Sequence, residues 1–283
     1  MAKKKVAVAV IHGIARRVDD RPPSSLDRTF SDALYKRVRR HIGGRLLDRD
    51  VAWREVFWSD ILSARQERYL NEISRITRYD KIRQFLVSGI ADAAAFQPRP
   101  DKPEGAYSLI LERMRQTFAE LNKDTNDGAP LMVLAHSFGG HIYSSFVWDM
   151  QQGRFSPPTP FQRMETLAQL VTFGSNIPLF TFACPPEEAH PIAFPGKGLD
   201  PQKRVTPWWL NYYDKDDVLG FPLGPIGPRY EAMVSRGELR DIQINAGGLF
   251  TSWNPLSHER YWTDRQFTRP VAEMVRELVR QQR

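Results

Sequence analysis

The sequence predicts an α/β protein with a mostly parallel central sheet and helices on both of its faces. Short apolar runs of strand length alternate along the chain with longer segments in which apolar residues recur at helical spacing. One such run, 131–134, leads directly into a tight turn of small residues and then into another helical segment. No linker rich in Gly and Ser and no charged block divides the 283 residues. We therefore expect one domain that spans residues 1–283.

The first half of the chain is expected to supply two strands, several helices and a helical insertion. Residues 6–11 are predicted to form the first strand, and Ser24 and Ser25 can cap a helix that Gly43 and Gly44 stop. A second strand is predicted over 51–58. The segment from 60 to about 97 has helical apolar spacing but is longer than a crossover needs. We interpret it as an insertion that either forms a cap or packs on the sheet.

The second half of the chain is expected to complete the sheet. A helix over 107–121 leads to the strand at 131–134, and further strands are predicted over 208–213 and 239–245, before a terminal helix. The segment from about 180 to 205 is rich in proline and has few periodic apolar residues, which indicates a long loop. Loops of this length in compact domains are often lids or binding loops.

The turn at 135–139 predicts the chemistry. Ala135 and Gly139 lie two residues on either side of Ser137, between an apolar strand and a helix. Small neighbours at these positions let the backbone close into a strained strand-to-helix turn that exposes a serine hydroxyl, the nucleophile elbow. Glycine is usual at the first position, so Ala135 is a departure, although its methyl group is the smallest possible addition. The pattern indicates that Ser137 is a nucleophile.

A serine nucleophile needs a histidine to accept its proton and a carboxylate to orient that histidine. Of the six histidines, only His258 follows a late strand and precedes the terminal helix. His136 and His141 flank Ser137 too closely in sequence to approach its hydroxyl easily, and we expect them to have packing or turn roles. The carboxylate belongs just past the strand at 208–213, where Asp214, Asp216 and Asp217 compete. Spacing alone does not choose among the three.

With these motifs the chain resembles the α/β-hydrolase superfamily, on its lipase and esterase side, and the resemblance covers nearly the whole sequence. It implies an α/β-hydrolase fold with a helical insertion. Residues 8–14 are similar to the first core strand of that family and its His-Gly turn, which implies that the backbone N–H groups of Ile14 and Phe138 form the oxyanion hole. Residues 171–179 resemble the strand and turn that follow the nucleophile helix. Residues 216–218 resemble the Asp-x-Val turn of the family, which favours Asp216 as the triad acid.

The charge and the motifs of the chain limit the classes of partner that we expect it to bind. With 40 basic and 33 acidic side chains the formal charge is +7, which we expect to be mostly solvated surface. No signature of a nucleic-acid-binding protein is present, so peripheral contact with an anionic membrane is the more credible role for this charge.

No spacing of metal ligands and no phosphate-binding loop appears, and we expect no metal and no cofactor. Cys184 is the only cysteine, and the N-terminal apolar run is shorter than that of a signal peptide. These features favour a cytoplasmic location.

The chemistry expected from the resemblance and the motifs is hydrolysis of a carboxylic ester through an acyl-enzyme, with Ser137, His258 and Asp216 as the triad. The substrate would be a small-molecule or lipid ester. An acyltransferase or thioesterase could use the same site, and a non-catalytic binding protein could keep the same fold. A peripheral phospholipase is a further alternative. The sequence does not fix the acyl length or the oligomeric state.

Overall fold

A computed structural model describes residues 2–14, 28–74, 76, 89–98, 104–246 and 255–282. The strands are β1 (Val6–Ile11), β2 (Val51–Val56), β3 (Leu131–His136), β4 (Leu167–Phe173), β5 (Trp209–Asp214) and β6 (Leu239–Ile244). The α-helices are α1 (Asp32–Ile42), α2 (Gly44–Asp50), α3 (Asp60–Ile73), α5 (Ala106–Asp124), α6 (Phe138–Gln151), α7 (Ile177–Thr181), α8 (Pro228–Ser235) and α9 (Arg265–Arg280), with another helical stretch over 89–95. The 3-10 helices are η1 (Pro186–Glu188), η2 (Pro201–Lys203), η3 (Gly224–Ile226) and η4 (Pro255–Trp262).

The six strands form one sheet in the order β2-β1-β3-β4-β5-β6, and every neighbouring pair is parallel. The structure therefore confirms an α/β protein with a parallel sheet flanked by helices. The chain moves from β1 outward to β2 and then returns past β1 to β3. Parallel sheets bind ligands in the crevice outside the carboxyl ends of the strands where the order reverses in this way. The turns after β1 and β3 meet at this point.

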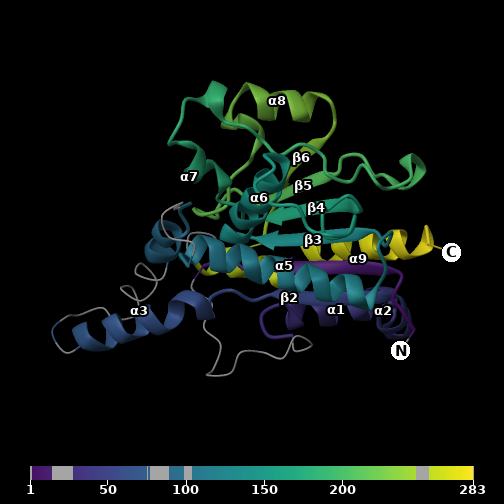
Figure 1. Cartoon of the computed structure of the whole chain (residues 1–283), viewed down its shortest axis with the longest axis horizontal. Helices are drawn as coiled ribbons and strands as arrows, with labels where there is room; N and C mark the ends of the chain where they lie inside the picture. The colour runs from purple at the N-terminus through teal and green to yellow at the C-terminus, as the bar shows by residue number, and fades with distance from the viewer. Residues whose placement is uncertain are drawn as a thin grey trace.

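The sheet separates two hydrophobic cores, as the alternation along β1 shows. Val6, Val8 and Val10 face one core, with buried residues of α1 and α9, whereas Ala7, Ala9 and Ile11 face the other, with residues of α5, α6 and α8. Figure 1 shows these helices on the two sides of the sheet. Right-handed crossovers explain why helices cover both faces of the sheet. When the next strand is added toward the other edge of the sheet, a right-handed connection places its helix on the opposite face. The direction reverses between β2 and β3.

Two details differ from the sequence-based expectation for the first helix. Helix α1 begins at Asp32, and Phe30 precedes it as non-helical chain. The predicted caps Ser24 and Ser25 lie outside the described residues. Gly43 ends α1 with a φ of 93°, which favours glycine, but the chain then forms α2 instead of passing directly to a strand.

The predicted insertion over 60–97 is described in two parts. Helix α3 and the stretch 89–95 are joined by a hydrogen bond of 2.7 Å from Gln66 Nε2 to Asp92 Oδ1. Ile90 is 66 % exposed, so it does not pack on the sheet, whereas Phe96 is buried against the ring of Phe138. Residues 75 and 77–88 lie outside the described ranges; they include Phe85 and Leu86, which the sequence suggests could line an acyl pocket if the insertion formed a cap. The described end of the insertion thus reaches the residue that follows Ser137.

The proline-rich segment 180–205 is mostly irregular but packed. It contains the end of α7, then η1 and η2. Ile192 is buried, and the ring of Phe194 lies 5.3 Å from that of Trp208. Phe182, in contrast, is 77 % exposed. The segment is therefore anchored by some of its apolar side chains and not by others.

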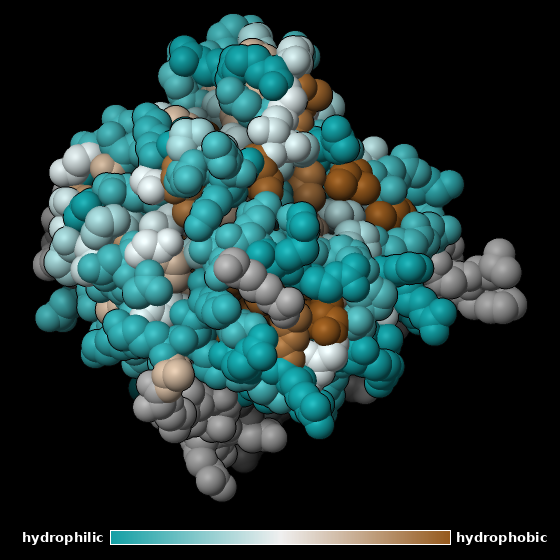
Figure 2. All heavy atoms as spheres, turned by 90° about the vertical axis from the view of Figure 1, so that its right-hand side faces the viewer, coloured by the Kyte–Doolittle hydropathy of each residue, from teal (hydrophilic) through white to brown (hydrophobic). Residues whose placement is uncertain are grey.

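The chain termini lie together at one end of the molecule, on the right in Figure 1. β1 starts at this end, so the carboxyl ends of all six parallel strands point to the opposite end, where α3 and α7 lie. The surface at the terminal end is largely hydrophilic, with hydrophobic residues in small separate groups (Figure 2). Within the described ranges, no helix combines the length and hydrophobicity that a membrane crossing requires.

Candidate functional site

Ser137 lies between β3 and α6 in a strained backbone conformation. Its φ is 53° and its ψ is −125°, a region that non-glycine residues rarely occupy. A hydrogen bond of 2.9 Å from Ser137 N–H to the carbonyl oxygen of Phe173 on β4 holds the turn in place. Strain of this kind persists where the surrounding structure imposes it, and it is the geometry of a nucleophile elbow.

Gly139 is required by the close approach of β1. A Cβ atom at this position would lie 2.8 Å from the carbonyl oxygen of His12 and 2.9 Å from that of Ile11. Both are backbone atoms, so neither can move without displacing the chain. The small residue predicted from the elbow pattern therefore has a specific cause, which is the packing of α6 against the end of β1.

The turn after β1 lies directly beside the serine. A Cβ atom on Gly13 would be 2.6 Å from Ser137 Cβ. Phe138 is the first residue of α6, so its N–H group has no acceptor within the helix. The structure therefore brings the backbone around Ile14 and Phe138 to the serine, as the oxyanion-hole prediction requires. That these N–H groups bind an oxyanion stays a prediction.

His12 holds the turn after β1 through both of its ring nitrogens. Its Nε2 accepts a hydrogen bond of 3.2 Å from the backbone N–H of Trp58. An amide N–H can only donate, so the ring proton is on Nδ1, which donates to the carbonyl oxygen of Gly13 at 2.6 Å. The ring also stacks on Trp58, with centroids 4.8 Å apart. These contacts give His12 a structural role in the turn.

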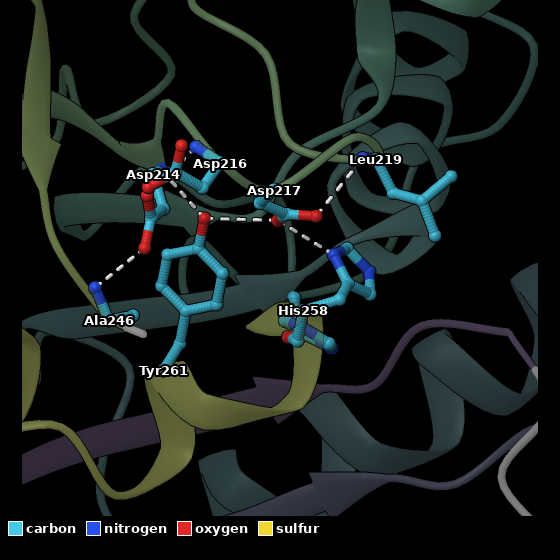
Figure 3. Close-up of polar contacts among 8 residues, drawn as sticks. Asp214, Asp216, Asp217, Leu219, Ala246, His258 and Tyr261 are labelled. Carbon is cyan, nitrogen blue, oxygen red and sulfur yellow. Dashed lines mark hydrogen bonds and ion pairs between the residues drawn. The ribbon is translucent and has the colours of Figure 1, made fainter. Parts of the chain in front are cut away.

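His258, on η4, is paired with Asp217 and not with Asp216. His258 Nδ1 lies 2.8 Å from Asp217 Oδ2, and both side chains are buried (Figure 3). The choice of Asp216 from the Asp-x-Val resemblance is therefore wrong for the residue that contacts the histidine. The turn after β5 explains the difference, because the N–H of Asp217 bonds to the carbonyl oxygen of Asp214 and directs the Asp217 carboxylate back toward η4.

The other two aspartates have different positions. Asp214 Oδ1 accepts the N–H of Asp216 at 3.0 Å, and Asp214 Oδ2 accepts the N–H of Ala246 at 2.7 Å. Asp214 thus ties the turn after β5 to the end of β6. Asp216 is partly exposed, and Figure 3 shows its side chain away from the imidazole. Of the three candidates from the sequence, only Asp217 meets the geometric requirement for orienting His258.

Tyr261 also belongs to this hydrogen-bond network, although no role was predicted for it from the sequence. Its hydroxyl accepts the N–H of Asp214 at 2.8 Å and donates to Asp217 Oδ2 at 3.0 Å (Figure 3). Burial, together with the nearby Asp217 charge, raises the pKa of Tyr261 above its ordinary value, so the hydroxyl keeps its proton and remains a donor. Asp217 Oδ1 accepts a further hydrogen bond of 3.0 Å from the N–H of Leu219. The position of Tyr261, three residues after His258, was the only sign of this role in the sequence.

The serine and the histidine converge on the end of β4. Ser137 N–H bonds to Phe173, and Gly174 follows with a φ of 54°. A Cβ on Gly174 would lie 3.1 Å from His258 Cε1, so glycine is needed both for the turn and for the imidazole. The ring of His136 packs against that of His258, with centroids 4.7 Å apart, and its Nε2 donates to the carbonyl oxygen of His258 at 2.9 Å. His136 therefore anchors η4.

Two buried polar atoms in this arrangement have no hydrogen bond to any described residue. They are Ser137 Oγ and His258 Nε2, the two atoms between which a proton moves when a serine is activated by a histidine. Ser137 is 1 % exposed and His258 is 5 % exposed. A buried polar group without a partner is costly and is often retained for function. The two atoms are not hydrogen-bonded to each other in this structure, and catalytic contacts of this kind are often longer before a substrate binds.

A large pocket lies near the serine turn but does not include Ser137. Its volume is about 630 Å³, and its walls come from α6, α7, residues 96–98 and residues 183–192. Three of its rings, those of Phe96, His141 and Phe180, contact the ring of Phe138 at 5.1 to 5.5 Å between centroids. Phe138, the residue after Ser137, thus packs against the aromatic wall of this pocket. Its volume is within the range of ligand pockets, roughly 300–1,000 Å³.

His141 gives this pocket an uncharged wall. Its ring stacks on Phe180 with centroids 4.1 Å apart. Burial lowers the pKa of His141 from 6.5 to about 4, so the side chain is neutral at pH 7. The packing role predicted for His141 agrees with this position. A second wall is polar, because Tyr107 and Arg154 both donate to the carboxylate of Asp149, at 2.9 Å and 2.7 Å.

Among the described residues, no group of three or more His, Cys, Asp or Glu side chains is arranged to hold a metal ion. No protein-family model matches the chain, and no curated protein matches it. Inference about function therefore rests on the geometry of this chain itself.

Proposed function

We propose that the protein is a serine hydrolase of the α/β-hydrolase fold that cleaves carboxylic esters. The triad is Ser137, His258 and Asp217, and the N–H groups of Phe138 and Ile14 form the oxyanion hole. The observation that carries the proposal is the strained Ser137 turn beside a buried histidine whose Nδ1 is bound by a carboxylate. These are the nucleophile, the base and the orienting acid of acyl transfer.

The reaction proceeds in two steps. His258 Nε2 takes the proton of Ser137 Oγ while Oγ attacks the ester carbonyl carbon, and the carbonyl oxygen becomes an oxyanion bound by backbone N–H groups. The C–O bond to the leaving group then breaks, and His258 gives its proton to the departing alkoxide. Water, activated by His258, attacks the acyl-enzyme and releases the acid and Ser137.

Labelling with a fluorescent fluorophosphonate tests the proposal. The wild-type protein should be labelled and should hydrolyse a p-nitrophenyl ester, whereas Ser137→Ala and His258→Ala should do neither. Loss of a triad member should lower kcat by about 10⁴-fold or more. The matched control is Ser108→Ala on α5, which removes a serine hydroxyl far along the chain from the turn. Equal labelling of Ser137→Ala and wild type would refute the proposal.

The pocket beside Phe138 supports an acyl chain as the group that the enzyme recognises. Its aromatic wall would accept a hydrocarbon, and burial of each CH₂ group is worth about 0.8 kcal/mol. Phe180 lies in this wall, so Phe180→Ala should shift the preferred acyl length in a series of p-nitrophenyl esters. Phe182→Ala is the control, because Phe182 is exposed and does not line the pocket. An identical length profile in both variants would exclude this pocket as the acyl site.

A further inference from the structure

A second concavity, of about 280 Å³, lies between α1 and α9, on the face of the sheet away from α5 and α6. Its lining is strongly basic. The residues are Arg37, Arg40 and His41 from α1, and Arg265, Thr268 and Arg269 from α9. We call this site the arginine pocket.

Each helix supplies its three residues at the same spacing. Positions 37, 40 and 41, and likewise 265, 268 and 269, are related as i, i+3 and i+4, so each set lies on one face of its helix. The two faces meet across one concavity. The pocket is therefore built by two regular elements and not by mobile chain ends.

The arginines of the pocket differ from their neighbours on the same helices. On α9, Arg276 and Arg280 are paired with Glu273 and Glu277, and on α1 Arg39 is paired with Asp48 at 2.8 Å. The side chains of the four pocket arginines, by contrast, make no hydrogen bond or ion pair to any residue in the described ranges. Apart from Glu273, which also contacts His41, these carboxylates are thus used outside the pocket.

One carboxylate lies close to the pocket but is already engaged. Glu273 Oε1 is 2.7 Å from His41 Nε2, and Glu273 also pairs with Arg276. The hydrogen bond from His41 and the charges of Arg276 and Arg269 lower the pKa of Glu273 below its ordinary value. Glu273 therefore carries one negative charge beside four guanidinium groups, and the pocket keeps a net positive charge.

Like charges gathered on adjacent helix turns destabilise a fold unless a counter-charge binds. The planar guanidinium fork matches the oxygens of a phosphate group, which it can bind through two parallel hydrogen bonds. The positive end of the α9 dipole, at Arg265, and the Thr268 hydroxyl add to this environment. We propose that the arginine pocket binds a phosphate group, carried either by a phospholipid head group or by a soluble phosphate ester.

A thermal-shift titration with sodium phosphate, against sodium chloride at equal ionic strength, tests the proposal. The variant is Arg40→Gln/Arg269→Gln, which removes one charge from each helix. The control is Arg45→Gln/Arg240→Gln, which removes two exposed charges outside the pocket. Phosphate should raise the Tm of wild type and control, and the pocket variant should bind ~100-fold more weakly, about tenfold for each lost charge-assisted hydrogen bond.

Two further arms make the result interpretable. Without phosphate, the pocket variant should melt no lower than wild type, because the substitutions remove repulsion and no internal partner. Co-sedimentation with phosphatidylcholine vesicles, with and without phosphatidic acid, is compared with titration of glycerol phosphate. Binding only to phosphatidic acid vesicles identifies a lipid source, and saturable stabilisation by glycerol phosphate without vesicle binding identifies a soluble one.

The proposal is overturned if phosphate stabilises wild type no more than chloride does, or if the pocket variant and the control respond equally. Measuring the same titration in Ser137→Ala separates this site from the proposed esterase, since phosphate binding requires no reactive serine.

Discussion

Replacing Asp217 with asparagine tests the assignment of the orienting carboxylate. Asp217 accepts hydrogen bonds from His258 and Tyr261 through Oδ2 and from Leu219 through Oδ1. All three partners donate, but an asparagine has one acceptor oxygen and one NH₂ donor. If the NH₂ group faces His258, the imidazole proton must move to Nε2, which then cannot accept the Ser137 proton. If it faces Leu219, two N–H groups oppose each other and the turn is destabilised.

The expected loss in kcat for Asp217→Asn is ~10⁴-fold, which corresponds to about 5.4 kcal/mol of transition-state stabilisation at 1.36 kcal/mol per tenfold. Asp216→Asn is the matched control, with the same chemical change one residue away. The Asp216 side chain is partly exposed and its backbone N–H makes the bond to Asp214. Surface changes of this kind alter stability by about 0.5 kcal/mol or less, so activity should stay within about twofold of wild type.

The assay is steady-state hydrolysis of a p-nitrophenyl ester by both variants, with circular dichroism to show equal folding. KM should change little in either variant, because neither aspartate lines the proposed acyl pocket. The reasoning is refuted if Asp216→Asn loses as much activity as Asp217→Asn, or if Asp217→Asn remains within about tenfold of wild type.

Three further variants test the surroundings of the site. Tyr261→Phe removes the donor to Asp217 and the hydroxyl that accepts the buried N–H of Asp214, so urea unfolding should show a loss of about 1–3 kcal/mol and kcat should fall. Gly139→Ala places a methyl group 2.8 Å from a backbone oxygen and should lower the Tm more than Gly140→Ala, whose methyl group would meet a serine side chain at 3.1 Å. His141→Phe should reduce the loss of stability as pH falls from about 7 to about 5.

The sign of the pH effect follows from the direction of the shift. Burial lowers the pKa of His141 to about 4 from 6.5, so between these values the unfolded chain binds a proton that the folded chain does not. The free energy of unfolding therefore falls as pH falls through this window, and phenylalanine removes that contribution. Equal pH slopes in wild type and His141→Phe would contradict this account. Unchanged stability in Tyr261→Phe, or equal melting of the two glycine variants, would contradict the other two predictions.

The sequence was most informative where structure is local. The Ser137 turn, its small neighbours and the strand before it are adjacent in the chain, so their pattern could be recognised directly. The same holds for the alternation of strands and helices that predicts a parallel sheet. His258 could be selected because its place in the chain order was distinctive. Helix α2 was missed, because Gly43 ends α1 without ending helical structure.

The parts that could not be predicted depend on the meeting of distant segments. Asp217 is distinguished from Asp216 only by the turn after β5 and by where η4 lies against it. The role of Tyr261 likewise depends on knowing which aspartate it reaches. The arginine pocket shows the same limit, since each i, i+3, i+4 triplet is visible in the sequence but the pairing of α1 with α9 is not.

The neutral donors around Asp217 explain why this carboxylate suits the proposed reaction. A buried carboxylate is costly unless it is hydrogen-bonded, and Tyr261 and Leu219 supply two hydrogen bonds without supplying charge. Within the described part of the chain, His258 is the only cationic partner that Asp217 contacts. The negative charge of Asp217 is therefore fully compensated only when the imidazole is protonated. In the proposed reaction the imidazole becomes protonated when Ser137 gives up its proton. The network would therefore stabilise the protonated imidazole most at the step in which catalysis requires it.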